Sequence, residues 1–372
     1  MAAGRVIFAT FAAYLIVLSA YSIGYTETHT VDVSSYIHMG EDLGGIYNGV
    51  YVYRGSEGYD GMSYYILSIN PFDFTLLDKV APPKQSAYRY QRILYPLVVH
   101  ILALGQKAAI PYVLLLVNLS CVSACILVGE KMWGKGNAML YLPLIAGVFI
   151  SVLLDLAEPL WILLIVMVYY FAIKNDDARA AFCLMMALFA KETALYILAA
   201  LVIYNLARKD MRKAVVYSLP LLPFLLWQGV LFQQFGEVPL LMSGELNRRS
   251  FTDLMASHLG PITYEVLPAY VLQLTVIAML LHSAYAVWKK FGLESCMYFM
   301  TSALLVFALA NTGGYDDVFN APRTMLPSTV AALFYLAKTG DKKTHIVLIP
   351  QVVITLGMSG LYVCTALLFL IR

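Results

Sequence analysis

Residues 110–129 read IPYVLLLVNLSCVSACILVG, twenty consecutive positions without a charged side chain. A helix of about 20 predominantly apolar residues spans the hydrocarbon core of a bilayer. The stretch therefore predicts a transmembrane helix. Because similar runs recur along most of the chain, it also sets the fold class.

The composition agrees with a membrane protein. Of the 372 residues, 60% are hydrophobic and 13% are charged, whereas an average soluble domain is about a quarter charged. These values exclude a soluble enzyme with one apolar segment, a disordered chain, a coiled coil and a disulfide scaffold. The formal net charge of +2 is too small to indicate nucleic-acid binding.

The apolar runs predict an all-α polytopic membrane protein with about eleven transmembrane helices in a single integral-membrane domain, residues 1–372. The first run, Val6–Gly24, is long for a signal peptide and has no small-residue cleavage pattern after it, so we interpret it as a retained span. Residues 93–104 are too short to cross and contain Pro96, which favours a juxtamembrane helix. The other runs lie at about 110–129, 137–155, 159–173, 180–190, 193–207, 214–235, 264–288, 293–311, 323–337 and 346–371.

The short basic clusters predict the orientation of these spans. When the spans alternate, every short basic cluster falls on the side of the N-terminus, as expected for the cytoplasmic face. The clusters are Lys131/Lys135, Lys174/Arg179, Arg208/Lys209/Arg212/Lys213, Lys289/Lys290 and Lys338/Lys342/Lys343. The opposite, extracytoplasmic face then receives a large first loop, residues 25–109, which carries the juxtamembrane segment.

This loop contains the octet GYDGMSYY around Asp60. Asp60 has aromatic and glycine neighbours, so it is the candidate general base beside a sugar-stacking surface formed by Tyr59 and Tyr64. The alternative is an ordinary turn, because Asp-Gly is a common turn dipeptide. Asp42 and Asp32, nearer the first span, are the main competitors for the role of base.

Two arginines, Arg89 and Arg92, lie in the stretch YRYQRILYPL at residues 88–97. The planar guanidinium group fits a phosphate, and at headgroup depth a lipid phosphate is the obvious ligand. The alternative is an interfacial anchor, since arginine and tyrosine both favour that zone.

Four ionisable residues lie near predicted outer helix ends. Asp155 and Glu158 flank a break between two spans, and Lys191 with Glu192 interrupts a strongly apolar stretch. Ionisable groups at membrane depth are costly, which makes each a functional candidate. The alternatives are an ion pair between Lys191 and Glu192, and helix capping by Glu158.

Arg323 is a further phosphate candidate at the outer start of a late span, with an ordinary snorkelling arginine as the alternative. Asp316 and Asp317 precede it, but hard cations take more oxygen ligands than this pair supplies. His100 and His282 each lack a second histidine one helical turn away, which favours packing roles. We therefore predict no metal site.

Taken together, these segments resemble the glycosyltransferase C superfamily, polytopic enzymes that use lipid-phosphate sugars on the extracytoplasmic face. The resemblance covers most of the chain and rests on an ordered set of motifs. In chain order they are GYDGMSYY at Asp60, YRYQRILYP at Arg89 and Arg92, AEPLW at Glu158, AKETALY at Lys191 and Glu192, and APRTMLP at Arg323. Related bacterial and archaeal membrane proteins look similar in that order.

The resemblance implies inverting transfer of a sugar from a polyprenyl-phosphate donor to an acceptor hydroxyl, with no cofactor, outside a prokaryotic cell membrane. Asp60 is then the base, and Arg89, Arg92, Lys191 and Arg323 hold the donor phosphate. Sugar or acceptor contacts fall to Tyr59, Tyr64, Asp42, Glu158 and Glu192. Membrane lipids are expected partners and nucleic acid is not.

The chain departs from better-known members of the superfamily. It lacks the adjacent acidic pair found early in the first loop of protein O-mannosyltransferases, and it has no sizeable soluble C-terminal domain. The acceptor, whether glycan, lipid or protein, therefore stays open. Two other functions use the same features: a transporter or flippase of lipid-linked sugars, with Asp60 non-catalytic, and a non-catalytic membrane assembly subunit.

Overall fold

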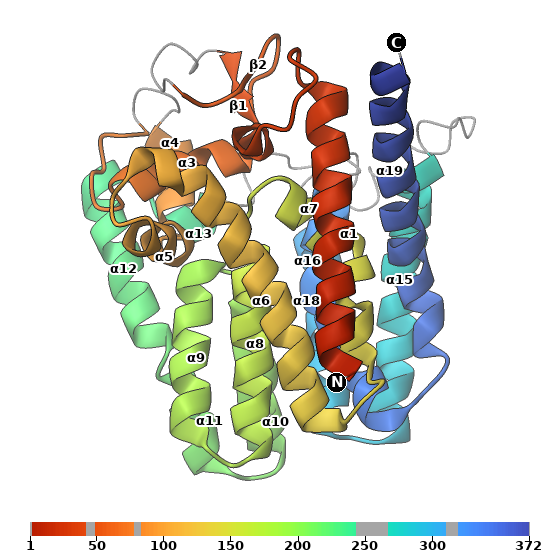
Figure 1. Ribbon diagram of the computed structural model, residues 1–372. Helices are drawn as coiled ribbons and strands as arrows, with labels where there is room; N and C mark the ends of the chain where they lie inside the picture. Colours follow the sequence, from red (N-terminus) through yellow and green to blue (C-terminus); the bar gives the residue numbers. More distant parts are fainter. Residues whose placement is uncertain (1, 42–48, 78–82, 243–266, 310–318, 372) are drawn as a thin grey trace.

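The computed structural model describes residues 2–41, 49–77, 83–242, 267–309 and 319–371 (Figure 1). In this part of the chain almost all regular structure is helical, which confirms the all-α prediction. The described strands, β1 (Met39–Gly40) and β2 (Val52–Tyr53), have two residues each and pair in parallel.

The helices are distributed along the whole described chain. In order they are α1 (Ala2–Tyr25), the 3-10 helix η1 (Val33–Ile37), α3 (Asp60–Ile69), α4 (Pro83–Tyr90), α5 (Leu94–Leu102), η2 (Lys107–Ala109), α6 (Ile110–Trp133), η3 (Ala138–Leu144), α7 (Ala146–Leu153), α8 (Glu158–Ile173), α9 (Asp177–Ala190), α10 (Ala194–Ala207), α11 (Met211–Ser218), α12 (Leu221–Phe235), α13 (Pro239–Met242), α15 (Leu267–Lys289), α16 (Leu293–Leu309), α17 (Asn320–Thr324), α18 (Leu326–Thr339) and α19 (Thr344–Ile371).

Several of these helices have the length and composition of membrane spans. Within the described residues, four helical stretches are long and apolar enough to cross a bilayer: Gly4–Tyr25, Lys107–Trp133, Met211–Phe235 and Thr344–Leu370. Shorter apolar helices cover Glu158–Ile173, Ala194–Ala207 and Leu274–Lys289. Helices of this length and composition fit an integral membrane protein, and the run at 110–129 lies inside one of the four long stretches.

The run at 137–155 does not form one continuous helix. It is divided into η3 and α7, with Pro143 inside η3 and an extended Ile145 between the two elements. Proline lacks the N–H that a regular helix requires, which explains the interruption. Residues 93–104, expected to form a short helix, form α5.

The N-terminus and the basic connections lie at one end of the helix bundle (Figure 1). The α8–α9, α10–α11 and α15–α16 connections meet at this end, whereas α3, α4 and the two strands lie at the other. The structure therefore separates the elements of the first loop from the short basic connections, as the alternation of spans predicts.

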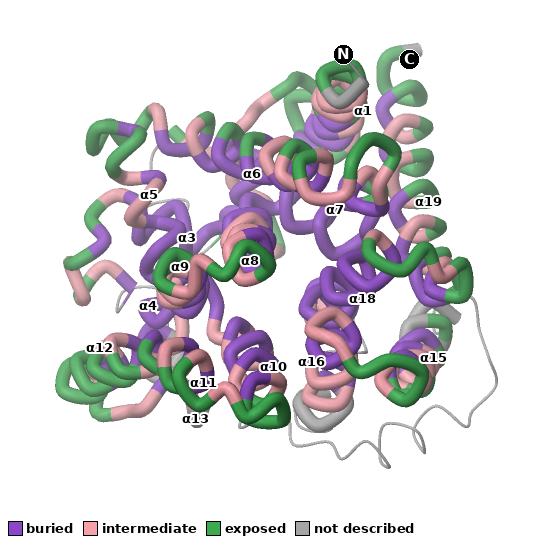
Figure 2. Tube along the Cα trace, turned by 90° about the horizontal axis from the view of Figure 1, so that it is seen from below, coloured by how far each residue is buried: buried purple, intermediate pink, exposed green. Residues whose placement is uncertain are grey.

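Burial varies strongly around the bundle (Figure 2). Helix α18 is buried along most of its length and Trp161 of α8 is fully buried, whereas α12 and α19 expose apolar side chains. Leu226 of α12 and Leu368 of α19 are both 64% exposed. Continuous apolar faces of this kind fit contact with lipid rather than with water.

Two glycines allow close helix contacts near the first-loop elements. A Cβ at Gly61 of α3 would lie 2.2 Å from a backbone oxygen of the α7–α8 connection, and one at Gly147 of α7 would lie 2.4 Å from the Pro322 oxygen of α17. Neither approach is possible with a side chain. Asp60 precedes Gly61 and Arg323 follows Pro322, so each of these close contacts lies next to one of the two residues.

Candidate functional site

Asp60 is the first residue of α3, and Tyr59 is the N-cap with extended backbone (φ −138°, ψ 175°). The octet therefore starts a helix rather than forming an isolated turn. A carboxylate in the first turn is favoured by the positive end of the helix dipole. The Asp60 side chain is 29% exposed, so it lies at the edge of the protein interior.

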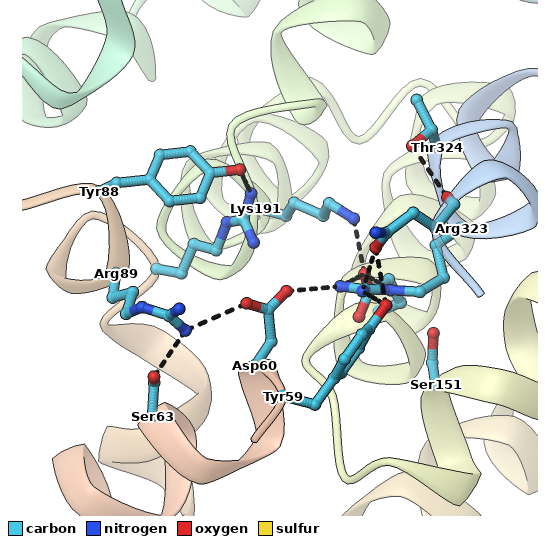
Figure 3. A network of polar contacts seen from close by, with 12 residues as sticks. Tyr59, Asp60, Ser63, Tyr88, Arg89, Ser151, Lys191, Arg323 and Thr324 are labelled. Atoms are coloured by element: carbon cyan, nitrogen blue, oxygen red, sulfur yellow. Dashed lines mark hydrogen bonds and ion pairs between the residues drawn. The ribbon is translucent and has the colours of Figure 1, made fainter. Parts of the chain in front are cut away.

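Two arginines from distant segments bind the carboxylate of Asp60 (Figure 3). Arg89, in the last turn of α4, donates from Nη1 to Asp60 Oδ1 at 3.0 Å and to Ser63 Oγ at 2.6 Å. Arg323 of α17 donates from Nη2 to Asp60 Oδ2 at 3.1 Å. The two guanidinium groups approach from opposite sides, so each carboxylate oxygen has its own donor.

Arg323 uses all three of its nitrogens. Its Nε donates to Glu158 Oε1 at 3.0 Å, and its Nη1 donates to the Tyr59 hydroxyl at 2.8 Å and to Asn320 Oδ1 at 3.2 Å. The Tyr59 hydroxyl in turn donates to Asn320 Oδ1 at 2.7 Å. The guanidinium lies 5.3 Å from the centre of the Tyr59 ring. Arg323 is therefore a fixed, buried connector between α3, α8 and α17.

Lys191 and Glu192 bind different partners and do not pair with each other in the described structure. Lys191 Nζ lies 2.6 Å from Glu158 Oε1. Arg92 binds Glu192 through two bonds, Nε to Oε2 at 2.8 Å and Nη2 to Oε1 at 2.6 Å. Arg92 also donates to the Tyr88 hydroxyl. A bidentate pair of this kind is stronger than a single hydrogen bond and also fixes the orientation of the guanidinium group.

The network holds more positive than negative charge. It contains four cationic side chains and three carboxylates, and Arg92, Glu158, Lys191 and Arg323 are buried. Buried charges are costly unless they are paired. One cation is left beyond the three carboxylates, so the network is suited to accept an anion at its exposed edge.

The arginines also set the ionisation of Asp60. Burial alone raises the pKa of this carboxyl, but the adjacent Arg89 and Arg323 guanidinium groups outweigh it and hold the pKa well below its usual value. Asp60 is therefore ionised at neutral pH. A carboxylate bound by two arginines is a weak base until one of them takes another partner.

A small cavity adjoins the network on the side of α4. It measures about 10 Å³ and is lined by Asp60, Ser63, Tyr64, Tyr88, Arg89 and Arg92. This is the scale of a single water molecule. The cavity therefore has room for one oxygen atom between two arginines and the candidate base.

The structure brings together most of the residues predicted from the sequence. The network contains Tyr59, Asp60, Arg89, Arg92, Glu158, Lys191, Glu192 and Arg323. Tyr64 lines the small cavity and packs edge-on against Tyr95 at 5.3 Å between ring centres. Asp42 lies outside the described residues, as do Asp316 and Asp317.

The two acids that flank the break before α8 differ. Glu158 joins the network, whereas Asp155 is fully buried and neither of its carboxylate oxygens has a hydrogen-bond partner among the described residues. Asp155 also has a left-handed backbone (φ 51°), which aspartate tolerates better than most residues. Asp155 therefore shapes the α7–α8 connection next to Gly61 without joining the ion pairs.

Sequence reasoning missed three residues of the network: Ser63, Tyr88 and Asn320. Ser63 accepts from Arg89, Tyr88 accepts from Arg92, and Asn320 accepts from both Arg323 and Tyr59. Helical spacing is the signal that points to them. Tyr88 precedes Arg92 by four positions and Asn320 precedes Arg323 by three, and such pairs share a helix face.

The donor set of the site suits an anion better than a cation. Its guanidinium, ammonium and phenol groups outnumber its three carboxylates, each of which is bound by a cation. Among the described residues no three histidine, cysteine or carboxylate side chains are placed to hold a metal ion. No protein-family model, curated protein or solved structure matches the chain. The arrangement of the residues is therefore what bears on function.

Proposed function

We propose that the protein is a membrane glycosyltransferase that moves a sugar from a polyprenyl-phosphate donor to an acceptor hydroxyl on the extracytoplasmic face. The observation that carries the proposal is the meeting of Arg89 and Arg323 on the two oxygens of Asp60, 3.0 and 3.1 Å away. This places phosphate-binding groups and a candidate base within one hydrogen bond of each other.

The location of the network supports a lipid-borne donor. Its residues come from α3, α4, α8, α17 and the α4–α5 and α9–α10 connections, at the end of the bundle opposite the N-terminus. With about eleven crossings and the basic connections in the cytoplasm, this end faces outside. A polyprenyl phosphate carries its sugar at the membrane surface, where such a site can reach it.

The proposed step is a direct displacement. The acceptor oxygen forms a bond to the anomeric carbon, and the bond between this carbon and the phosphate oxygen breaks. The electron pair of that bond leaves with polyprenyl phosphate, and the acceptor proton passes to Asp60. Displacement from the opposite side inverts the anomeric centre. The donor bond supplies the energy, so the reaction consumes no nucleotide at this site.

The cations lower the barrier by stabilising the leaving phosphate. Arg89 and Arg323 are already oriented by Ser63, Glu158 and Tyr59, so little reorganisation is needed when charge develops. Arg92 and Lys191, which bind Glu192 and Glu158 rather than Asp60, add positive electrostatic potential at the site. Tyr59, which is half-buried, offers an aromatic face to the sugar, whereas Tyr64 is buried and lines only the small cavity. Glu192 and Glu158 hold the cations in position.

Donor binding also activates the base. A phosphate that accepts bonds from Arg89 and Arg323 competes with Asp60 for the same donors. As the phosphate shares the N–H groups of the arginines, which stay in place, their bonds to Asp60 weaken, the pKa of Asp60 rises and the carboxylate becomes a better proton acceptor. The low pKa in the ligand-free state is consistent with a base that is blocked until the donor arrives.

The test uses the purified full chain in lipid nanodiscs. It is given polyprenyl-phosphate mannose, glucose and arabinose in turn, with mixed glycan, lipid and peptide acceptors, and release of polyprenyl phosphate is measured. The expected result is release by the wild-type protein and loss of release in Asp60→Asn. Arg179→Gln, on the opposite end with a 72% exposed side chain, is the matched control and is expected to retain activity.

Two outcomes overturn the proposal. If the protein moves these donors between the leaflets of sealed vesicles and releases no polyprenyl phosphate, it is a flippase. If release occurs equally in Asp60→Asn and in an Arg89→Ala, Arg323→Ala double variant, the reaction takes place elsewhere.

A further inference from the structure

A second, much larger cavity lies at the opposite end of the bundle from Asp60. It measures about 1150 Å³ and is bounded by the ends of α8, α10, α15, α16 and α18 together with the α18–α19 connection. Figure 2 is a view onto this end. Nothing in the proposed transfer reaction uses it.

Positive charge dominates the lining. The basic residues are Arg208, Lys213, Lys289, Lys290, Lys338 and Lys342, and the acidic residues are Asp210, Glu294 and Asp341. The acids are already engaged by neighbours. Asp210 accepts from the Lys213 backbone N–H, Glu294 accepts from the Tyr169 hydroxyl, and Asp341 accepts from the Lys343 backbone N–H.

Four of the lysines have no carboxylate partner among the described residues. Lys289 is the last residue of α15 and Lys290 follows it, Lys338 lies in the last turn of α18, and Lys342 lies in the next connection. Two segments far apart in the sequence, 289–290 and 338–342, thus bring lysines to the lining of one cavity. Unpaired like charges that share a cavity repel, and an anion placed between them removes that cost.

The same cavity has apolar and aromatic walls. Ile173, Leu201 and Leu293 line it beside Tyr204 and Phe291. A small inorganic anion would contact only the basic residues of the lining. A ligand with a charged head and an apolar body would contact both the basic and the apolar residues.

Exposed aromatic residues lie at this end of α15. Trp288, in the last turn of α15, is 84% exposed, and Phe291 is 49% exposed. Exposed aromatic residues at the end of an apolar helix are typical of the headgroup region. The lysines therefore lie where phosphate groups of the cytoplasmic leaflet are found.

We propose that this cavity binds a phosphate-bearing anion at the cytoplasmic surface, either the headgroup of an anionic phospholipid or a soluble phosphate ester. Basic pockets between membrane helices on the cytoplasmic side recognise anionic headgroups. The proposal does not depend on the transferase reaction, because the cavity lies at the other end of the protein.

The test measures binding to the full chain. In the lipid arm, the protein is mixed with nanodiscs of phosphatidylcholine alone or with phosphatidylglycerol added, and bound lipid is counted by native mass spectrometry. In the soluble arm, glycerol 3-phosphate is titrated into the detergent-solubilised protein by calorimetry. The variant Lys289→Gln, Lys290→Gln, Lys338→Gln, Lys342→Gln removes the four unpaired charges.

The control is Lys209→Gln, Arg212→Gln, which removes two charges, and it is compared with the two-charge cavity variant Lys289→Gln, Lys290→Gln as well as with the four-charge variant. Lys209 and Arg212 are exposed on the same face but do not line the cavity. The expected result is preferential binding of phosphatidylglycerol or of glycerol 3-phosphate, weakened at least tenfold in the cavity variant and unchanged in the control. Preference only for the lipid identifies a headgroup, and binding of the ester alone identifies a soluble ligand.

Three results overturn the proposal. One is no preference for either anion by the wild-type protein. Another is an equal loss in the control, which indicates general surface charge. The third is unchanged binding in a cavity variant that has the wild-type unfolding temperature. Since the four lysine side chains are exposed, the variant is expected to fold.

Discussion

Arg323 and Asp60 are 263 positions apart in the chain, yet Arg323 Nη2 lies 3.1 Å from Asp60 Oδ2. Both residues reach this point through contacts with the same part of the protein. Helix α3 meets the α7–α8 connection at Gly61, and α17 meets α7 at Gly147. The short helix α7 and the α7–α8 connection thus position both halves of the candidate site.

Replacing Asp60 with Asn separates a catalytic role from a structural one. Asn keeps the shape of the side chain but cannot accept the proton, so the rate of sugar transfer should fall by about 10²–10⁴-fold. Loss of a negative charge beside two arginines should leave donor affinity unchanged or tighter. Transfer rate and donor affinity of the purified variant measure both effects. A near-normal rate would defeat the assignment and favour Asp42.

Replacing Arg323 with Lys tests the geometry of the network. Lysine keeps the charge, but its single nitrogen cannot reach Asp60, Glu158 and Tyr59 at once. Donor affinity should fall at least tenfold and the unfolding temperature should drop. Arg323→Ala should be worse, because breaking a buried ion pair costs about 3–5 kcal/mol.

The control for Arg323 is Arg179→Lys at an exposed ion pair with Asp176. A surface pair contributes about 0–1 kcal/mol, so this change should be almost silent. If Arg323→Lys has the donor affinity and unfolding temperature of the wild type, the multiple contacts of the Arg323 guanidinium group are not required.

Replacing Gly61 with Ala tests the close approach of α3. The added Cβ lies 2.2 Å from a backbone oxygen, so α3 must move. Overpacking of this kind costs about 1–3 kcal/mol, and the shift should also misplace the adjacent Asp60. Circular dichroism melting and the transfer assay measure the two consequences. Gly357→Ala, in open space on α19, should be neutral or slightly stabilising, and equal behaviour of both variants would contradict the argument.

The ion pairs of Asp60 predict a pH dependence of stability. The folded-state pKa of Asp60 is lowered by Arg89 and Arg323, so its contribution is fully present above the unfolded pKa of about 3.9 and is lost as pH falls toward the folded value. The gap in unfolding temperature between wild type and Asp60→Asn should be constant from about pH 5 to 7 and shrink below about pH 4. A gap that is widest at low pH would have the wrong sign.

The orientation in the membrane can be tested by cysteine labelling. In a Cys364→Ala background, Met211→Cys should resist a membrane-impermeant maleimide added to intact cells, because its loop is predicted to be cytoplasmic. Phe72→Cys, in the first loop, should label. Both native side chains are exposed, at 61% and 58%, so the protein itself does not shield either position. Labelling of Met211→Cys from outside would reverse the topology.

The sequence alone was sufficient for the all-α class of fold, and it singled out most of the residues that the structure brings together. Long uncharged runs such as 110–129 predict membrane helices because an apolar side chain gains free energy in lipid at every position. Ionisable residues inside such runs, such as Glu158 and Lys191, can be recognised as functional candidates because a charge at membrane depth costs free energy. These signals are local, and they hold whatever the helices pack against.

The tertiary structure decided how the charged residues pair. Lys191 and Glu192 are neighbours in sequence, yet they bind Glu158 and Arg92. Ser63 and Asn320 entered the network through contacts that composition does not reveal. An ion pair forms between atoms within about 4 Å, and that distance depends on how closely helices approach. Here the approach is set by the missing side chains of Gly61 and Gly147, whose effect exists only once the helices are packed.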